Sequence, residues 1–401
     1  VLRCKYEMGL AADPYVDEKQ AEKNVNTAAD IALARQVAQE SITLLENRNN
    51  TLPLSKNVRV ALVGPNADNV YNMLGDYTAP QTEGNVATVL DGIRSKLPIG
   101  QVTYVKGCSI RDTTQNNIAE AVEAARNSDV VVACVGGSSA RDFKTNYKST
   151  GAAETDANTV SDMDSGEGFD RATLSLLGLQ DKLLKALKAT GKPLVVVYIE
   201  GRPLEKNWAA AHADALLTAY YPGQQGGNAI ANVLFGDVNP SGRLPISVPR
   251  SVGQLPVYYN HPLPEPHDYV EMTARPLYAF GYGKSYTTFE YSRLTVNAVS
   301  KDSISVSFDV TNTGTRDGAE VVQLYLNDSV ASVAQPVKQL RRFARVPLTK
   351  GQTKHITFTL HAADLAIINR EKQRTVEPGW FNVMVGAASN DIRLRGKFQI
   401  L

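Results

Sequence analysis

Cysteine, tryptophan and histidine are scarce in this chain, with three, two and five copies among 401 residues. The cysteines, Cys4, Cys108 and Cys134, form no Cys-x-x-Cys pair, so we expect neither a disulfide framework nor a zinc site. Lys and Arg (42) barely exceed Asp and Glu (41), so the chain lacks the positive excess that phosphate backbones attract. No apolar run approaches the ~20 residues of a membrane span, and no signal-peptide pattern opens the sequence. We therefore expect neither nucleic acid nor a membrane as a partner.

Motifs that bind nucleotides or metals are also missing. The "GYGKS" segment would be a phosphate-binding loop only with a glycine at position 278, where Tyr278 stands. A calcium loop counted from Asp162 needs a glutamate at its twelfth position, and Thr173 occupies it. There is no HExxH, and "GGSSARD" lacks the GxGxxG spacing of dinucleotide sites. We expect no metal and no organic cofactor, and a nucleotide-binding protein is the least favoured alternative.

Apolar, β-branched runs alternate with helix-like segments over residues 57–248. This alternation is typical of an α/β fold with a mostly parallel sheet, and it follows a helix predicted over 28–46. The near-continuous valines, isoleucines and leucines of the central runs indicate strands buried on both faces. The pattern predicts six strands, at 58–64, 101–105, 129–136, 193–201, 213–223 and 243–248.

The rest of the chain follows a different rhythm. A proline-rich passage, placed within a linker over 251–290, interrupts the α/β pattern that we assign to 18–250. Beyond it, over 291–401, apolar and polar residues alternate in short runs separated by turn signals such as "NTGTRDG". About seven such runs predict a β-sandwich of the immunoglobulin or fibronectin type III kind.

One connection in the α/β region is unusually long. From Gly136 to about Leu174 nearly forty residues show little periodicity, whereas most such connections take ~2–6 residues. The connection contains the segment "SDMDSGEGFDR", with four acidic residues, one of which, Glu167, lies between two glycines. It leaves the carboxyl end of a strand, which is where open α/β sheets bind ligands. A merely solvated acidic loop is the alternative.

Carboxyl groups that lie close together resist ionisation, because each charge disfavours the next. A carboxylic acid in such a cluster can donate a proton near neutral pH. A glycosidase needs one such acid to protonate the departing glycosidic oxygen and a second carboxylate on the other side of the sugar. The local pattern does not say which acid is the donor or where its counterpart lies.

Several motifs in a fixed order resemble glycoside hydrolase family 3, in its β-glucosidase and β-xylosidase branch. They are "SGEGFDR", "GRLPISVPRSVGQLPVYY", "PLYAFGYGKSYTTFEYS", "VTNTGTRDGAEVVQLYL" and "VEPGWFNVMVGAASNDIRL". The resemblance implies a barrel domain, then a six-stranded α/β sandwich, then a fibronectin type III-like domain. Residues 1–17 resemble the exit from the barrel, so the chain looks like the family without its first domain.

The resemblance assigns roles residue by residue. Glu167 matches the family's general acid/base, and Phe169 matches an aromatic residue that lines the pocket on the leaving-group side; core packing is the alternative for Phe169. Asp170 and Arg171 complete the motif as an opposite-charge pair that braces the loop. The family's nucleophile is an Asp on the barrel, and no residue of this chain matches it. The barrel domain is therefore an expected partner, and the chain alone is expected to be inactive.

Two further residues are candidates for sugar contact. Asp76, in "GDYTAP", follows the first predicted strand and could reach the mouth of the site, with a role in loop structure as the favoured alternative. Trp380 has a ring suited to stacking on sugars, but it lies in an alternating run, which favours packing in the core or at a domain interface.

The resemblance implies a retaining, exo-acting β-glucosidase or β-xylosidase that removes terminal sugars from β-linked oligosaccharides. Such chemistry requires no cofactor. The family suggests a periplasmic or secreted location. A noncatalytic carbohydrate-binding or structural module is the alternative function.

Overall fold

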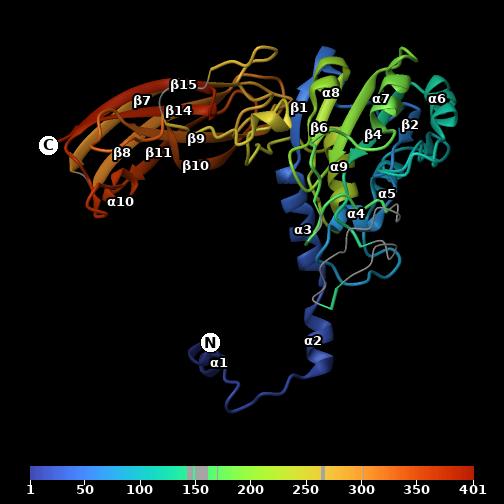
Figure 1. Ribbon diagram of the computed structural model, residues 1–401, viewed down its shortest axis with the longest axis horizontal. Helices are drawn as coiled ribbons and strands as arrows, with labels where there is room; N and C mark the ends of the chain where they lie inside the picture. Colours follow the sequence, from blue (N-terminus) through green and yellow to red (C-terminus); the bar gives the residue numbers. More distant parts are fainter. Residues whose placement is uncertain (142–147, 150–160, 169, 263–266, 301) are drawn as a thin grey trace.

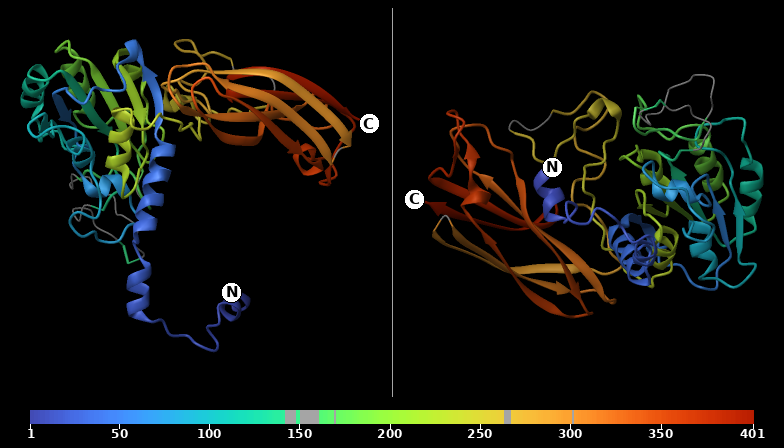
Figure 2. Two further views of the ribbon diagram at one scale, coloured as in Figure 1. Left: turned by 180° about the vertical axis from the view of Figure 1, so that it is seen from behind. Right: turned by 90° about the horizontal axis from the view of Figure 1, so that it is seen from below.

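The computed structural model describes residues 1–141, 148–149, 161–168, 170–262, 267–300 and 302–401. Two folded domains lie side by side, and an N-terminal arm extends away from the first of them (Figures 1 and 2). The arm carries helices α1 (Leu2–Glu7) and α2 (Glu18–Asn24), neither of which contains a buried residue. Of the helices in the described ranges, none has the length and apolar character needed to cross a bilayer.

The first domain is built on a six-stranded sheet in the order β1-β6-β5-β4-β2-β3. All neighbouring strands are parallel except β1, which runs antiparallel to β6. This confirms the predicted six-stranded, mostly parallel sheet. Its strands are β1 (Thr43–Asn47), β2 (Val60–Val63), β3 (Val102–Val105), β4 (Val130–Gly136), β5 (Leu194–Ile199) and β6 (Ala215–Thr218).

One of the six predicted strands was wrong, as was the end of the predicted N-terminal helix. Helix α3 (Ala28–Ser41) stops before Thr43, and the residues that follow form β1. Leu44 and Leu45 point into opposite core layers and are fully buried, which a helix on one face of the sheet could not achieve. The segment predicted as a strand at 243–248 hydrogen-bonds instead to the later turn, where the Leu244 amide donates to the Tyr282 carbonyl at 2.9 Å.

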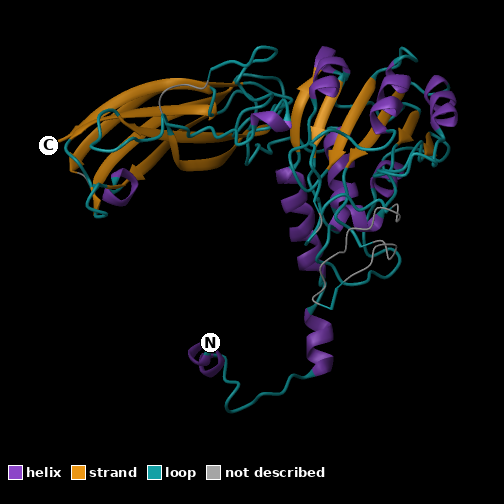
Figure 3. Ribbon diagram, in the orientation of Figure 1, coloured by secondary structure: helices purple, strands orange, loops and turns teal. Residues whose placement is uncertain are grey.

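Helices cover both faces of the sheet (Figure 3). Helices α3, α5 (Val89–Arg94) and α9 (Gly226–Leu234) bury their apolar residues in one core layer. Helices α6 (Ile118–Arg126), α7 (Gln180–Lys188) and α8 (Asn207–His212) bury theirs in the other. The chain therefore leaves β2 toward one face and leaves the adjacent β4 toward the other, which opens a crevice between their carboxyl ends.

The second domain is an antiparallel β-sandwich, as predicted, with one four-stranded and one three-stranded sheet. Alternate side chains of both sheets form a single apolar core that includes Phe308, Leu324 and Val383. Its strands are β7 (Phe289–Ser300), β8 (Ser303–Asn312), β9 (Gly318–Asp328), β10 (Gln339–Leu348), β11 (Thr353–Leu360), β14 (Gly379–Ala388) and β15 (Asp391–Ile400). A short pair, β12 (Ile367–Ile368) and β13 (Arg374–Thr375), and helix α10 (Ala362–Leu365) lie beside it.

Candidate active site

Two loops meet over the crevice between β2 and β4. The loop after β2 contains the short helix α4 (Val70–Leu74) and then Asp76 and Tyr77. The loop after β4 contains Glu167. Because β2 and β4 are neighbours with opposite exits, segments about ninety positions apart in sequence lie together at one point of the sheet.

Glu167 is exposed and is held by contacts from the β2 loop. The Tyr77 hydroxyl donates a hydrogen bond to Oε2 of Glu167 at 2.8 Å, and the Glu167 amide donates to Oδ2 of Asp76 at 3.3 Å. This hydrogen bond to the Glu167 carboxylate raises the pKa of the Tyr77 hydroxyl. The flanking glycines fit tight positions. Gly168 has φ of 72°, and a Cβ on Gly166 would lie 2.2 Å from Cε of Met163 and 3.3 Å from Oδ2 of Asp76.

Asp76 braces the loop that carries Glu167. Its other oxygen, Oδ1, accepts a hydrogen bond from Nε of Arg141 at 3.0 Å, and its side chain is largely buried. Both carboxylate oxygens are therefore engaged by protein groups. Sugar contact by Asp76 stays a prediction, but the contacts favour the alternative role in loop structure.

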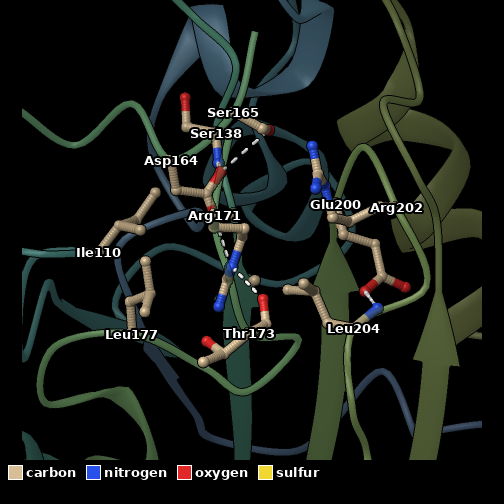
Figure 4. A network of polar contacts seen from close by, with 12 residues as sticks. Ile110, Ser138, Asp164, Ser165, Arg171, Thr173, Leu177, Glu200, Arg202 and Leu204 are labelled. Carbon is tan, nitrogen blue, oxygen red and sulfur yellow. Dashed lines mark hydrogen bonds and ion pairs between the residues drawn. The ribbon is translucent and has the colours of Figure 1, made fainter. Parts of the chain in front are cut away.

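Asp164 forms a buried ion pair beneath the loop. Its Oδ2 lies 2.6 Å from Nη1 of Arg171, and the two side chains are only 3% and 5% exposed. Oδ1 of Asp164 also accepts from the Ser138 amide at 3.0 Å and from the Ser165 hydroxyl at 3.2 Å. Figure 4 shows Arg171 next to Asp164 and the Thr173 carbonyl, which accepts from Nε of Arg171 at 2.8 Å. The pair fixes both ends of the segment around Glu167.

The other two acids of the cluster are paired as well. Asp162 accepts from the amides of Ile110 and Arg111 at 2.9 and 3.3 Å. Asp170 forms an ion pair with Arg202, and the backbone amide of Arg171 together with that pair lowers the pKa of Asp170. The four acids therefore do not confront one another as the sequence pattern led us to expect. Three of them have partners that anchor the loop, while Glu167 is exposed and accepts a hydrogen bond from Tyr77.

A buried charge pair at the end of β5 positions Arg202. Nζ of Lys206 lies 2.7 Å from Oε1 of Glu200, and both side chains are essentially inaccessible. Oε2 of Glu200 accepts from the Leu204 amide at 3.1 Å, which closes the turn from which Arg202 extends (Figure 4). Burial lowers the pKa of the Lys206 ammonium, and the Glu200 carboxylate opposes that shift. The turn after β5 is thus connected to Asp170 by the Arg202 ion pair.

A chain of buried amides and a hydroxyl underlies the crevice, and the sequence analysis missed it. Nδ2 of Asn72 donates to Oδ1 of Asn66 at 2.7 Å, and the Ser138 hydroxyl donates to Oδ1 of Asn72 at 2.6 Å. Asn66 also bonds to the carbonyls of Gly137 and Ile199. These hydrogen bonds join the loops after β2 and β4. The available signal was an asparagine placed just after a buried apolar strand, in "VALVGPNAD".

Two predicted aromatic positions have different outcomes. Phe169 lies outside the described residues, so its role on the leaving-group side stays a prediction. Trp380 lies on the outer face of β14 and is 44% exposed, with Nζ of Lys397 4.6 Å from its ring centre. Of the two packing roles predicted for Trp380, core packing is wrong, because strand alternation turns its neighbour Phe381 inward instead. Packing of Trp380 at a domain interface stays a prediction.

The described part of the chain contains no group of three histidine, cysteine or acidic side chains placed to bind a metal ion. The charges around Glu167 are compensated by arginines and backbone amides. What the arrangement offers chemically is one exposed carboxyl group on a braced loop, with a hydroxyl donor beside it. Such a group can give and take a proton at a substrate atom that approaches from solvent.

Family models match most of the chain. The glycosyl hydrolase family 3 C-terminal domain matches residues 42–286, and a fibronectin type III-like domain matches residues 320–389. A periplasmic β-glucosidase from Salmonella typhimurium is 40% identical over 441 aligned positions, which cover 100% of this chain and 54% of the relative. A β-xylosidase from Formosa agariphila is 39% identical, over 97% of this chain and 53% of the relative.

Solved structures agree with these matches. A mutant β-glucosidase from Listeria innocua, in complex with laminaribiose, superposes with a TM-score of 0.87 at 32% identity, covering 100% of this chain and 54% of that one. A β-glucosidase from Erythrobacter marinus gives a TM-score of 0.85 at 35% identity, covering 99% of this chain and 54% of that one. The chain therefore spans about half the length of the proteins it matches.

Proposed function

The chain belongs to glycoside hydrolase family 3, and from this premise we propose that it is the part of a retaining, exo-acting β-glycosidase that supplies the general acid/base, Glu167. The observation that carries the proposal is the exposed Glu167 carboxylate at the crevice between β2 and β4, hydrogen-bonded to Tyr77 at 2.8 Å. In the first step Glu167 protonates the departing glycosidic oxygen. In the second step it takes a proton from the water that releases the sugar.

The nucleophile is proposed to come from another domain. Retention requires a second carboxyl group about 5–5.5 Å from the acid, free to attack the sugar. Among the described residues, Asp76 is the carboxylate that contacts the Glu167 residue, and its oxygens are engaged by Arg141 and by the Glu167 amide. The nucleophilic Asp is therefore assigned to the barrel domain that the family places before this region.

Exposed apolar side chains support a domain docked on this side. Leu33 and Val37 on α3 are each 60% exposed, and Tyr77 beside Glu167 is 79% exposed. In Figure 1 the N-terminal arm extends on the same side as the carboxyl ends of the parallel strands. A barrel packed against this side would cover these side chains and bring its nucleophile opposite Glu167.

The relatives guide the choice of substrate and compartment. We assign a terminal β-linked glucose or xylose as the sugar that is released, because relatives that match this chain are named β-glucosidase and β-xylosidase. We assign an exported location, as in the periplasmic relative. No cofactor takes part in the mechanism.

The test joins this chain to the half of the Salmonella typhimurium relative that it does not cover. Aryl β-glucosides and β-xylosides should be hydrolysed by the combination and not by the chain alone. Glu167→Gln should slow hydrolysis about 10²–10⁴-fold with a poorly departing aglycone. With an aglycone that leaves without protonation, the first step should survive, and azide should restore turnover because it attacks the glycosyl intermediate without a general base.

Glu83→Gln is the matched control, since Glu83 is an exposed glutamate of the loop that carries Tyr77. It should leave both substrates unaffected. Equal loss with both aglycones in the Glu167 variant, without azide rescue, would remove Glu167 from the acid/base role. Sugar binding with no turnover in any combination would favour the noncatalytic carbohydrate-binding module.

A further inference from the structure

A cavity of about 750 Å³ lies between the two domains, far along the sheet from Glu167. It is lined by Asn47 at the end of β1, by Asn50 just after β1, and by residues of the linker and the sandwich. Because β1 is antiparallel to its neighbour, its carboxyl end lies at the amino ends of the parallel strands. The cavity is therefore on the opposite edge of the sheet from Glu167, and its volume lies within the range of small-molecule sites.

The lining carries an excess of positive charge. Four basic side chains line the cavity, and three of them are paired with acids. These pairs are Arg243 with Glu320 at 3.1 Å, Lys284 with Glu46 at 2.7 Å and Arg393 with Asp391 at 2.9 Å. The fourth, Arg316, is exposed, and its guanidinium makes no hydrogen bond or ion pair within the described ranges. In the part of the chain that the structure describes, Arg316 is therefore left without a counter-charge.

A buried donor of Arg243 lies beside the cavity. Its side chain is only 8% exposed, and its buried Nε has no hydrogen-bond partner among the described residues. Its Nη atoms donate to Glu320 and to the carbonyls of Ser241 and Gly242. A buried N–H without a partner is costly, and such groups in folded proteins usually meet a water, an ion or a ligand. Arg243 and Glu320 also tie the first domain to the sandwich, so the orphan donor lies at the domain junction.

Neutral hydrogen-bonding groups lie on both sides of the cavity. Asn50 belongs to the first domain and Thr315 to the sandwich, and neither side chain has a partner among the described residues. Amide and hydroxyl groups of this kind bind sugar hydroxyls, whereas guanidinium groups bind carboxylates and phosphates with paired hydrogen bonds.

We propose that this interdomain cavity binds a small sugar that carries a carboxylate or a phosphate, with Arg316 facing the anionic group. Asn50 and Thr315 bind its hydroxyls. The site differs from the proposed active site in place and in charge. Since Asn50 and Arg316 belong to different domains, a bound ligand links the two domains and stabilises their arrangement.

The experiment measures thermal unfolding and calorimetric titration of the 401-residue chain. D-glucuronate and D-glucose 6-phosphate are the two anionic probes, inorganic phosphate tests the anion alone, and D-glucose is the neutral probe of the same shape. We expect one of the sugar anions to raise the Tm and bind at least tenfold more tightly than glucose at equal ionic strength. Comparing the two tells a carboxylate site from a phosphate site.

Arg316→Gln should weaken that binding about tenfold or more, whereas Arg395→Gln should leave it unchanged. Arg395 is an exposed arginine on β15 that does not line the cavity, and Arg316 is exposed too, so both variants should fold. Anionic sugars that bind no better than glucose, or a sugar anion that binds Arg316→Gln as tightly as the original chain, would overturn the proposal. So would inorganic phosphate that matches both sugar anions.

Discussion

Buried polar side chains serve different purposes in the two domains. In the α/β domain they gather at the carboxyl edge of the sheet, where Asn66, Asn72 and Ser138 join the loops and Lys206 pairs with Glu200. In the sandwich, the interior between the sheets is apolar. A buried polar group of the sandwich, Glu320, faces the first domain.

The difference shows where each domain uses costly polar burial. Buried charges and amides are stable only when they are paired, and a paired network fixes one geometry. The α/β domain places that geometry beneath Glu167. The sandwich places Glu320 at the domain junction, and the core between its sheets is packed from apolar side chains.

Of the substitutions that test this comparison, Lys206→Met should have the largest effect on stability. It leaves Glu200 buried without its counter-charge, which should lower the free energy of unfolding of the first domain by about 3–5 kcal/mol. Urea unfolding measures the loss, and hydrogen exchange over 161–168 should rise as the turn that holds Arg202 loosens. Lys185→Met is the control, because the Lys185 ion pair with Asp181 is exposed and should matter by less than about 1 kcal/mol. Similar losses in the two variants would contradict a role for the buried pair.

The stability of the sandwich should depend on the volume of its core side chains and not on charge pairs. Leu324→Ala removes a fully buried side chain and should cost about 2–5 kcal/mol in the unfolding of the second domain. Calorimetry that resolves the two domains should show the unfolding transition of the α/β domain nearly unchanged. A comparable loss in the α/β domain would mean that the two cores are coupled more strongly than the contrast implies.

A smaller effect is expected at the exposed end of the α/β network. Tyr77→Phe removes the hydroxyl that donates to Glu167 and nothing from the core, since Tyr77 is 79% exposed. Hydrolysis by the barrel-completed enzyme should fall about 5- to 10-fold, with an unchanged Tm. Unchanged hydrolysis would show that Asp76 and the glycines position Glu167 without the hydroxyl.

The smallest expected effect is a pH dependence of the stability of the Glu167 loop, caused by protonation of Asp170. The Arg171 amide and Arg202 lower the pKa of Asp170, so its contribution to the fold is complete above the unfolded pKa of about 3.9. The contribution is lost as the pH falls through the lower, folded pKa. Proteolysis of the Glu167 loop should therefore increase slightly below pH 4, and Asp170→Asn should remove that dependence.

The sequence predicted the architecture because its signals were local. Apolar β-branched runs specified five of the six strands, alternation specified the sandwich, and the matches confirm the resemblance to glycoside hydrolase family 3. The sixth strand was misplaced because Thr43 to Asn47 follows a helix without a break, and its extended form depends on pairing with β6.

The site was only partly predictable. The glycines pointed to Glu167, but the partners of the surrounding acids come from distant segments. Arg202 meets Asp170 only because β4 and β5 are adjacent, and Tyr77 meets Glu167 only because β2 and β4 are. No local pattern carries that information.

The crevice between β2 and β4 also sets a rule for engineering. Glu167 and Tyr77 arrive on separate loops that share the buried link between Asn72 and Ser138. A chimera that imports only the β4 loop from a relative would inherit an acid without its matching support. Both loops therefore have to be transplanted together, as a single cassette, if the geometry around Glu167 is to be kept.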